Sequence, residues 1–194
     1  MKIRYKTIEH ERTEDAPFVG ALISSIDCKF KCKGCFNRKA KLLPNIEREA
    51  DEIIEEITSN PFNEGIIFGG LEWSLQPVEL VELFEKASNA GLKIIIYTGC
   101  TAEEFYKRIG KGCADRIGFK ADELSKAMMD DNADELFGLM GRTILDYYIK
   151  ADYYLKTGLY DREHPAIDRV HFGVSLASTN QNIFLIKKTE GEEE

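Results

Sequence analysis

The chain has 194 residues, of which 43% are hydrophobic and 31% charged, and this length and composition predict one globular domain with a hydrophobic core. Its 34 acidic and 26 basic residues leave a formal net charge of −8, which disfavours nucleic acid and anionic lipid as partners. The opening segment is charged and no later stretch is apolar enough to span a membrane, so we expect a cytoplasmic protein.

Strands and helices alternate in the first part of the chain. An apolar run at 18–27 predicts a buried strand that leads into a group of cysteines. After Pro44, apolar residues at helical spacing predict an amphipathic helix that Asn45 caps. The run 65–68 predicts a second strand, which ends at the glycine pair 69–70.

The same alternation continues further along the chain. Pro77 is predicted as the first residue of a second helix, which stops near Gly91. Residues 93–98 predict another buried strand, and Thr101 and Glu104 stand at capping-box spacing ahead of a third helix. A regular βα rhythm of this kind predicts parallel βαβ units.

The last third of the sequence is less regular. Apolar spacing predicts a helical insertion at 111–146, interrupted by the polar residues 130–132. Residues 148–155 predict a further strand, 183–186 an edge strand, and 190–194 a frayed acidic tail.

The fold class expected from these elements is α/β, with residues 1–194 forming a single domain. A complete eight-fold barrel takes about 250 residues, more than this chain has. We therefore predict a partial, open (β/α) barrel of parallel strands that carries the helical insertion.

A cysteine cluster follows the first predicted strand, with Cys28, Cys32 and Cys35 in the spacing CxxxCxxC. Three of the five cysteines in so short a stretch favour metal chemistry over a disulfide framework. Three thiolates suit a [4Fe-4S] cluster that keeps one iron open. A zinc site would need Cys100 and Cys113 as further ligands, and a redox dithiol at Cys32 and Cys35 would leave Cys28 without a role.

The cysteine loop resembles that of the radical S-adenosylmethionine enzymes, in which the open iron binds the amino and carboxylate groups of the cofactor. Its form at 32–37, CxGCxN, is similar to the activating proteins of anaerobic ribonucleotide reductases. The glycine turn 69–70 and the segment STNQ at 178–181 resemble two further motifs of that family. The resemblance spans residues 18–186.

This resemblance implies two cofactors, a [4Fe-4S] cluster and S-adenosylmethionine. It implies cluster ligation by Cys28, Cys32 and Cys35, and contacts to the second cofactor from Gly34, Cys35, Phe36, Gly69 and Gly70. Leu71 separates the glycine pair from Glu72, which makes this carboxylate a weaker candidate ligand than its counterpart in the family pattern. No role is assigned to Cys100 or Cys113.

The activity implied is that of a radical S-adenosylmethionine oxidoreductase. The reduced cluster cleaves the cofactor, and the resulting radical takes a hydrogen from a glycine of an anaerobic ribonucleoside-triphosphate reductase, leaving a stored glycyl radical there. Asn180 and Gln181 are candidate contacts to that partner or simply residues of a turn. Two alternatives remain: a radical enzyme acting on a small molecule such as a purine-like heterocycle, and a metal-stabilised binding module without catalysis.

Positive charge surrounds the cysteines of this otherwise acidic chain. On one interpretation the charge receives an acidic electron donor resembling flavodoxin or ferredoxin, and on the other it is a solvated loop surface. The cations are Lys29, Lys31, Lys33, Arg38, Lys39 and Lys41.

Overall fold

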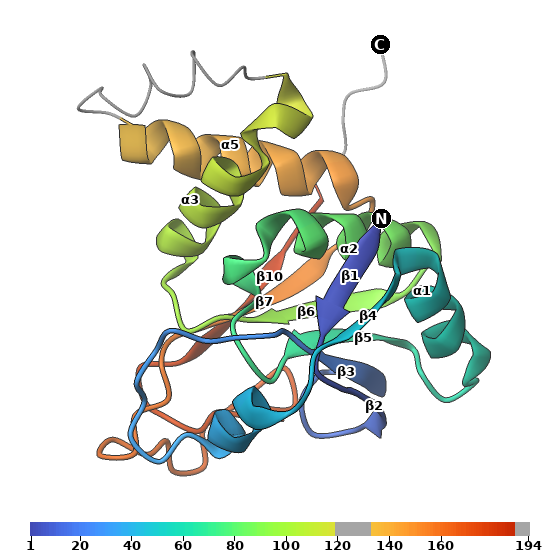
Figure 1. The fold of residues 1–194 in the computed structure, drawn as a ribbon. Helices are drawn as coiled ribbons and strands as arrows, with labels where there is room; N and C mark the ends of the chain where they lie inside the picture. The colour runs from blue at the N-terminus through green and yellow to red at the C-terminus, as the bar shows by residue number, and fades with distance from the viewer. Residues whose placement is uncertain (119–132, 189–194) are drawn as a thin grey trace.

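The computed structural model describes residues 1–118 and 133–188, and a six-stranded sheet lies at its centre (Figure 1). The strand order is β10-β7-β6-β5-β3-β2. The four central strands are parallel, whereas β2 and β10 are antiparallel to their neighbours at the two edges. The strands are β2 (Ile8–Arg12), β3 (Gly20–Ser24), β5 (Gly65–Gly69), β6 (Lys93–Tyr97), β7 (Tyr153–Thr157) and β10 (Asn182–Ile186).

The fold is therefore mixed α/β, as the sequence predicts, but the expectation of parallel strands throughout is wrong at both edges. Strand β2 returns directly into β3, and β10 returns to β7 through a long loop. A return without a crossover helix leads to antiparallel pairing. The edge strand predicted at 183–186 is confirmed as β10.

The N-terminal segment forms a second, small sheet that changes the first predicted helix. Strand β1 (Lys2–Tyr5) pairs antiparallel with β4 (Ile46–Glu49). The predicted helix does not start at Asn45, so the prediction is wrong there. The four residues after Asn45 form β4, and pairing with β1 holds them extended. Helix α1 (Ala50–Ser59) begins after them, with Glu49 in a reciprocal capping box with Glu52.

Helices cover one face of the central sheet (Figure 1). Besides α1 they are α2 (Pro77–Asn89), α3 (Ala102–Cys113) and α5 (Ala133–Tyr148). The apolar faces of these helices and the sheet residues that point towards them enclose the main core, in which Phe68, Trp73 and Phe84 are fully buried. Among the described residues, no helix is long and apolar enough to cross a lipid bilayer.

Helices α3 and α5 approach each other through two glycines. A Cβ on Gly110 would lie 2.0 Å from the carbonyl oxygen of Phe137, and one on Gly141 would lie 1.8 Å from that of Tyr106. Larger residues at these positions would push the two helices apart. The contact explains why both helices carry a residue of low helix propensity in their interiors.

The region 111–146 is helical where it is described, through the end of α3, the 3-10 turn η3 (Ala114–Ile117) and α5. The predicted interruption at 130–132 and the acidic tail 190–194 lie outside the described residues. The strand predicted at 148–155 starts too early. Helix α5 continues to Tyr148 because Ile144 and Leu145 are buried at helical spacing, and β7 begins only at Tyr153.

The other face of the sheet is covered by loops instead of helices. Ile67 and Ile95 form a small apolar cluster there, packed against Leu22, Tyr97 and Tyr154. One covering loop joins β3 to β4 and contains the 3-10 helix η1 (Phe36–Leu42). The other follows β7, contains the hairpin β8 (Val170–His171) and β9 (Val174–Ser175), and leads into β10.

Candidate functional site

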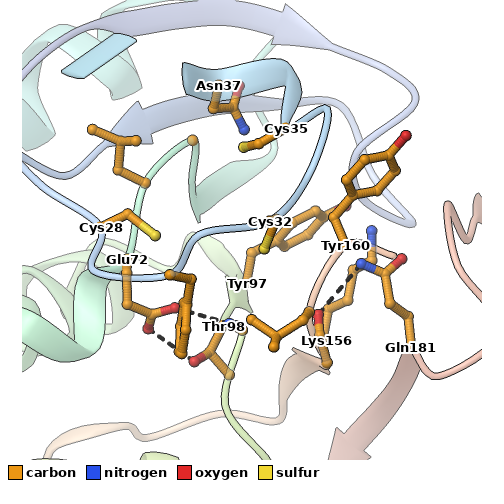
Figure 2. A pocket seen from close by; sticks show the side chains of 16 residues that line it. Cys28, Cys32, Cys35, Asn37, Glu72, Tyr97, Thr98, Lys156, Tyr160 and Gln181 are labelled. Carbon is orange, nitrogen blue, oxygen red and sulfur yellow. Dashed lines mark hydrogen bonds between the residues drawn. The ribbon is translucent and has the colours of Figure 1, made fainter. Parts of the chain in front are cut away.

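The three cysteines lie in the loop that follows β3, at the carboxyl ends of the parallel strands. We call residues 27–43 the cysteine loop. Parallel strands end at one edge of a sheet, so the loops after β3, β5, β6 and β7 converge there. Cys28, Cys32 and Cys35 are half-buried, free, and line one cavity together with Gly70 and Thr98 (Figure 2).

Three cysteines that line one cavity are the donor set that a [4Fe-4S] cluster with one open iron takes. Burial raises the pKa of the Cys28 thiol, and metal ligation is what displaces such a proton. The donor set therefore fits the cluster, while the ligand roles stay a prediction.

The remaining two cysteines lie in the main core. Cys100 is buried, with its Sγ 3.8 Å from Ser74 Oγ, and Cys113 is fully enclosed in α3. Burial raises the pKa of both thiols, that of Cys113 to about 12. They are protonated at neutral pH, and the structure does not gather them with the loop cysteines as the zinc alternative requires.

The glycine turn after β5 has a conformation that favours glycine. Gly70 has φ +71°, and a Cβ there would come within 2.2 Å of Ser24 Oγ. Its backbone lines the cavity of the cysteines. Of the other residues predicted to contact a cofactor, Cys35 and Phe36 line the cavities at this edge, whereas Gly34 and Gly69 lie outside the lining.

Glu72 is bound to the protein itself. Its side chain is 3% exposed, and its carboxylate accepts hydrogen bonds from Thr98 Oγ1 at 2.8 Å, Gly99 N at 2.8 Å and Ser74 N at 3.2 Å (Figure 2). The residue after it, Trp73, donates from Nε1 to the Ile23 carbonyl at 3.0 Å. Glu72 thus ties the turn after β5 to the end of β6, and most of its acceptor capacity is used in doing so.

A lysine that sequence reasoning missed stands in the wall of the same cavity. Lys156, in β7, is 8% exposed, and its Nζ lies 4.2 Å from the centroid of the Tyr97 ring. Within the described parts of the chain this ammonium makes no hydrogen bond or ion pair, and burial lowers its pKa to about 8. The period of two along β7, which places Lys156 on the face of Tyr154, is the signal that could have found it.

A second, polar cavity adjoins the first and shares Gly70, Tyr97 and Lys156 with it. We call this cavity, of about 460 Å³, the polar chamber. The Tyr97 hydroxyl in its wall donates to the Asp15 carbonyl at 2.5 Å. Ser24 Oγ also lines it and is buried without a hydrogen-bond partner among residues 1–118 and 133–188. Buried hydroxyls are normally paired, so this one has capacity for a ligand.

The segment 178–181 closes a turn beside the cavity. Gln181 accepts from Ala177 N at 3.0 Å and donates to the Gly158 carbonyl at 3.4 Å, and it lines the cavity with its remaining surface (Figure 2). Asn180 is exposed. The turn interpretation is therefore confirmed for Gln181, and a partner contact by either residue stays a prediction.

Most of the predicted cations are free of internal partners. Lys33 pairs with Glu163 at 3.1 Å and Lys41 with Asp27 at 3.2 Å. In the described part of the chain, the others form no ion pair and are exposed; these are Lys29, Lys31, Arg38 and Lys39.

The chain was also compared with known families and proteins. A family model described as "4Fe-4S single cluster domain" matches residues 20–129. The match contains the three loop cysteines and the glycine turn, whereas Lys156 and the segment 178–181 lie beyond it. No curated protein matches the chain.

Proposed function

The chain belongs to the 4Fe-4S single cluster domain family, whose model covers more than half of it, and from this premise we propose that it is a radical S-adenosylmethionine enzyme. The proposed reaction generates a glycyl radical on an anaerobic ribonucleoside-triphosphate reductase, on a sheet that forms a partial, open barrel. The observation that carries the proposal is the number of cysteines. Three thiols, not four, surround a cavity that continues into the polar chamber.

The cysteine loop would hold the cluster through Cys28, Cys32 and Cys35. When bound, the cluster supplies the electron that cleaves the carbon–sulfur bond of the sulfonium. The protein contributes a half-buried cavity that limits access of water, together with free cations that offset the negative charge of thiolate ligands. The same cations are where an acidic electron donor, resembling flavodoxin or ferredoxin, would approach.

Three residues of the wall suit the amino-acid end of S-adenosylmethionine. Lys156 offers a buried ammonium that has no hydrogen-bond or ion-pair partner among the described residues, and a carboxylate would satisfy it. Ser24 lines the polar chamber too and offers a hydroxyl that is unpaired within the same residues. Gly70, lacking a Cβ, lets its backbone approach a ligand closely.

A protein substrate is favoured by the exposed apolar residues around the site. The large hydrophobic side chains with the highest exposure in the described residues are Leu42 (86%), Ile167 (82%) and Phe36 (78%). All three belong to the loops that cover the face of the sheet opposite the helices. The ring centroids of Phe36 and Tyr160 lie 5.0 Å apart where these loops meet. Exposed apolar residues around a cavity are typical of an interaction surface.

One observation favours the small-molecule alternative. The polar chamber, at about 460 Å³, has the size of an ordinary ligand pocket. A radical enzyme acting on a compact heterocycle would use this chamber for the substrate itself. A metabolite screen for release of 5′-deoxyadenosine separates the two functions.

The proposal is tested with the full chain, reconstituted anaerobically with iron and sulfide. Reduction by dithionite in the presence of S-adenosylmethionine and the cognate reductase should produce a glycyl-radical doublet in electron spin resonance. The reductase alone should show none. A missing doublet, together with 5′-deoxyadenosine release in the presence of a metabolite, would assign the enzyme to the small-molecule class.

A further inference from the structure

The cysteine loop has almost no core of its own. Its one regular element, η1, contains no buried residue. Fixing the backbone of so many residues costs about 1–2 kcal/mol each in conformational entropy, so contacts from outside the loop must order it. Lys6 makes such a contact from outside the loop, and Lys41, inside it, connects the end of the loop to its start.

Lys6 binds the last residues of the cysteine loop. It follows β1 and is only 7% exposed, and its backbone N donates to the Ser24 carbonyl at 2.8 Å. Its ammonium donates to the carbonyls of Leu43 at 2.5 Å and Lys41 at 3.2 Å. A buried charge is costly unless hydrogen-bonded, so the ammonium and these carbonyls hold each other in place.

Lys41 carries the connection across to the first cysteine. Its ammonium donates to the Cys28 carbonyl and pairs with Asp27 Oδ1 at 3.2 Å. The same carboxylate oxygen accepts from Cys28 N at 2.7 Å. The backbone N–H and the carbonyl of Cys28 are thereby both held in place.

The loop is also anchored near its start, at Phe30. Phe30 packs against the main core, with the Arg108 guanidinium 5.7 Å from its ring centroid. A Cβ on Gly99 would lie 2.5 Å from the ring, so the slot closes tightly on it. Because Phe30 still holds the loop two residues after Cys28, loss of the lysine contacts should loosen Cys28 and the end of the loop without unfolding all of it.

We propose that Lys6 and Lys41 form a clasp that positions Cys28 before any cluster binds, which makes the N-terminal strand part of the cluster site. The family match begins at residue 20, so Lys6 lies outside the matched residues. The proposal depends on the proposed function only in that the loop holds a cluster. Both lysines are positioning residues, and Lys6, being buried, carries the larger share because exposed ion pairs are weak.

The test begins with the apoprotein, in which cluster chemistry plays no part. Iodoacetamide labelling, followed by peptide mass spectrometry, gives the modification rate of each cysteine. Lys6→Met should speed labelling of Cys28 about threefold or more, because the loop opens more often. Lys6→Arg keeps a buried cation and should restore part of the protection. Lys2→Met is the matched control, since Lys2 belongs to the same N-terminal segment but is exposed and pairs with Glu47.

A second measurement follows the reconstituted protein. Chelator-driven loss of the cluster, followed by its visible absorbance, should be faster in Lys6→Met than in Lys2→Met, with intermediate rates in Lys6→Arg. If Lys6→Met also lowers the thermal midpoint of the whole protein, Lys41→Met decides, because that side chain is part of the loop and leaves β1 intact. Equal Cys28 labelling in wild type, Lys41→Met and Lys2→Met would overturn the clasp.

Failure of the clasp and failure of the proposed function give different results. Protected Cys28 in the apoprotein together with zinc in place of iron after reconstitution would retain the clasp and refute the cluster. A normal glycyl-radical doublet with unchanged labelling in the Lys6 and Lys41 variants would support the proposed function and refute the clasp.

Discussion

The two faces of the central sheet differ in how they are covered and in what remains unsatisfied. The helix-covered face is closed by complementary apolar packing around Phe68 and Phe84. The loop-covered face contains a buried lysine, half-buried thiols, strongly exposed apolar side chains and a serine hydroxyl that has no partner in the described part of the chain. Such features are costly for stability alone, so their concentration on one face indicates where ligands and partners bind.

The sharpest test of this contrast compares cysteines from the two faces. Cys28→Ala, Cys32→Ala or Cys35→Ala should abolish the cluster, because each removes the ligand of one iron. Cys113→Ala should keep the cluster and lose only about 1 kcal/mol of unfolding free energy from the small cavity. Iron and sulfide analysis after reconstitution gives the readout, and loss of iron in Cys113→Ala would contradict the assignment.

Phenylalanines from the two faces should differ in their effect on stability. Phe84→Ala empties a fully buried position next to Phe68 and should cost about 3–5 kcal/mol in chemical denaturation. Phe36→Ala removes an exposed ring and should change stability by about 0.5 kcal/mol or less. A large loss in Phe36→Ala would show that its ring is structural and not part of an interaction surface.

Two glycines in the same left-handed region separate backbone strain from crowding. Gly70 has φ +71° and faces Ser24, whereas Gly91 has φ +72° with nothing within 4 Å of an added Cβ. Alanine at either position should cost about 1–2 kcal/mol from strain. Gly70→Ala should cost more and should also weaken S-adenosylmethionine binding in calorimetry. Equal affinity in the two variants would place the cofactor elsewhere.

The buried lysine predicts opposite pH effects on stability and on binding. Because the pKa of Lys156 is lowered to about 8, the unfolded chain binds more protons above that pH, and stability relative to Lys156→Met should rise from pH 8 towards the ordinary lysine pKa of 10.5. Affinity for S-adenosylmethionine should instead fall as pH rises through 8, since the ammonium is lost. A flat affinity profile in wild type would remove Lys156 from the cofactor site.

The exposed apolar residues give the smallest expected effect on the protein itself. Ile167→Asp should lower the yield of glycyl radical with dithionite as reductant. The variant loses an apolar contact and places a charge in the interface, and both changes weaken docking of the reductase. Phe62→Asp is the control, since Phe62 is 66% exposed but belongs to the turn after α1. Dithionite bypasses any protein electron donor, so a difference reports on the radical-accepting partner. Equal yields would favour the small-molecule alternative.

Local patterns in the sequence were enough to predict the buried strands β3, β5 and β6 and the starts of α2 and α3. The cysteine spacing is itself such a pattern. Apolar periodicity, Pro77 and the Thr101 cap act within one element, so they can be identified without knowledge of the rest of the chain. Only the tertiary structure decided the pairing of β10 with β7 and of β1 with β4, because each depends on a strand far away in the chain. For the same reason no local pattern predicted that Lys156 and Ser24 would line one cavity, or that Lys6 would bind the end of the cysteine loop. A buried polar group acquires its meaning from neighbours that only folding brings together.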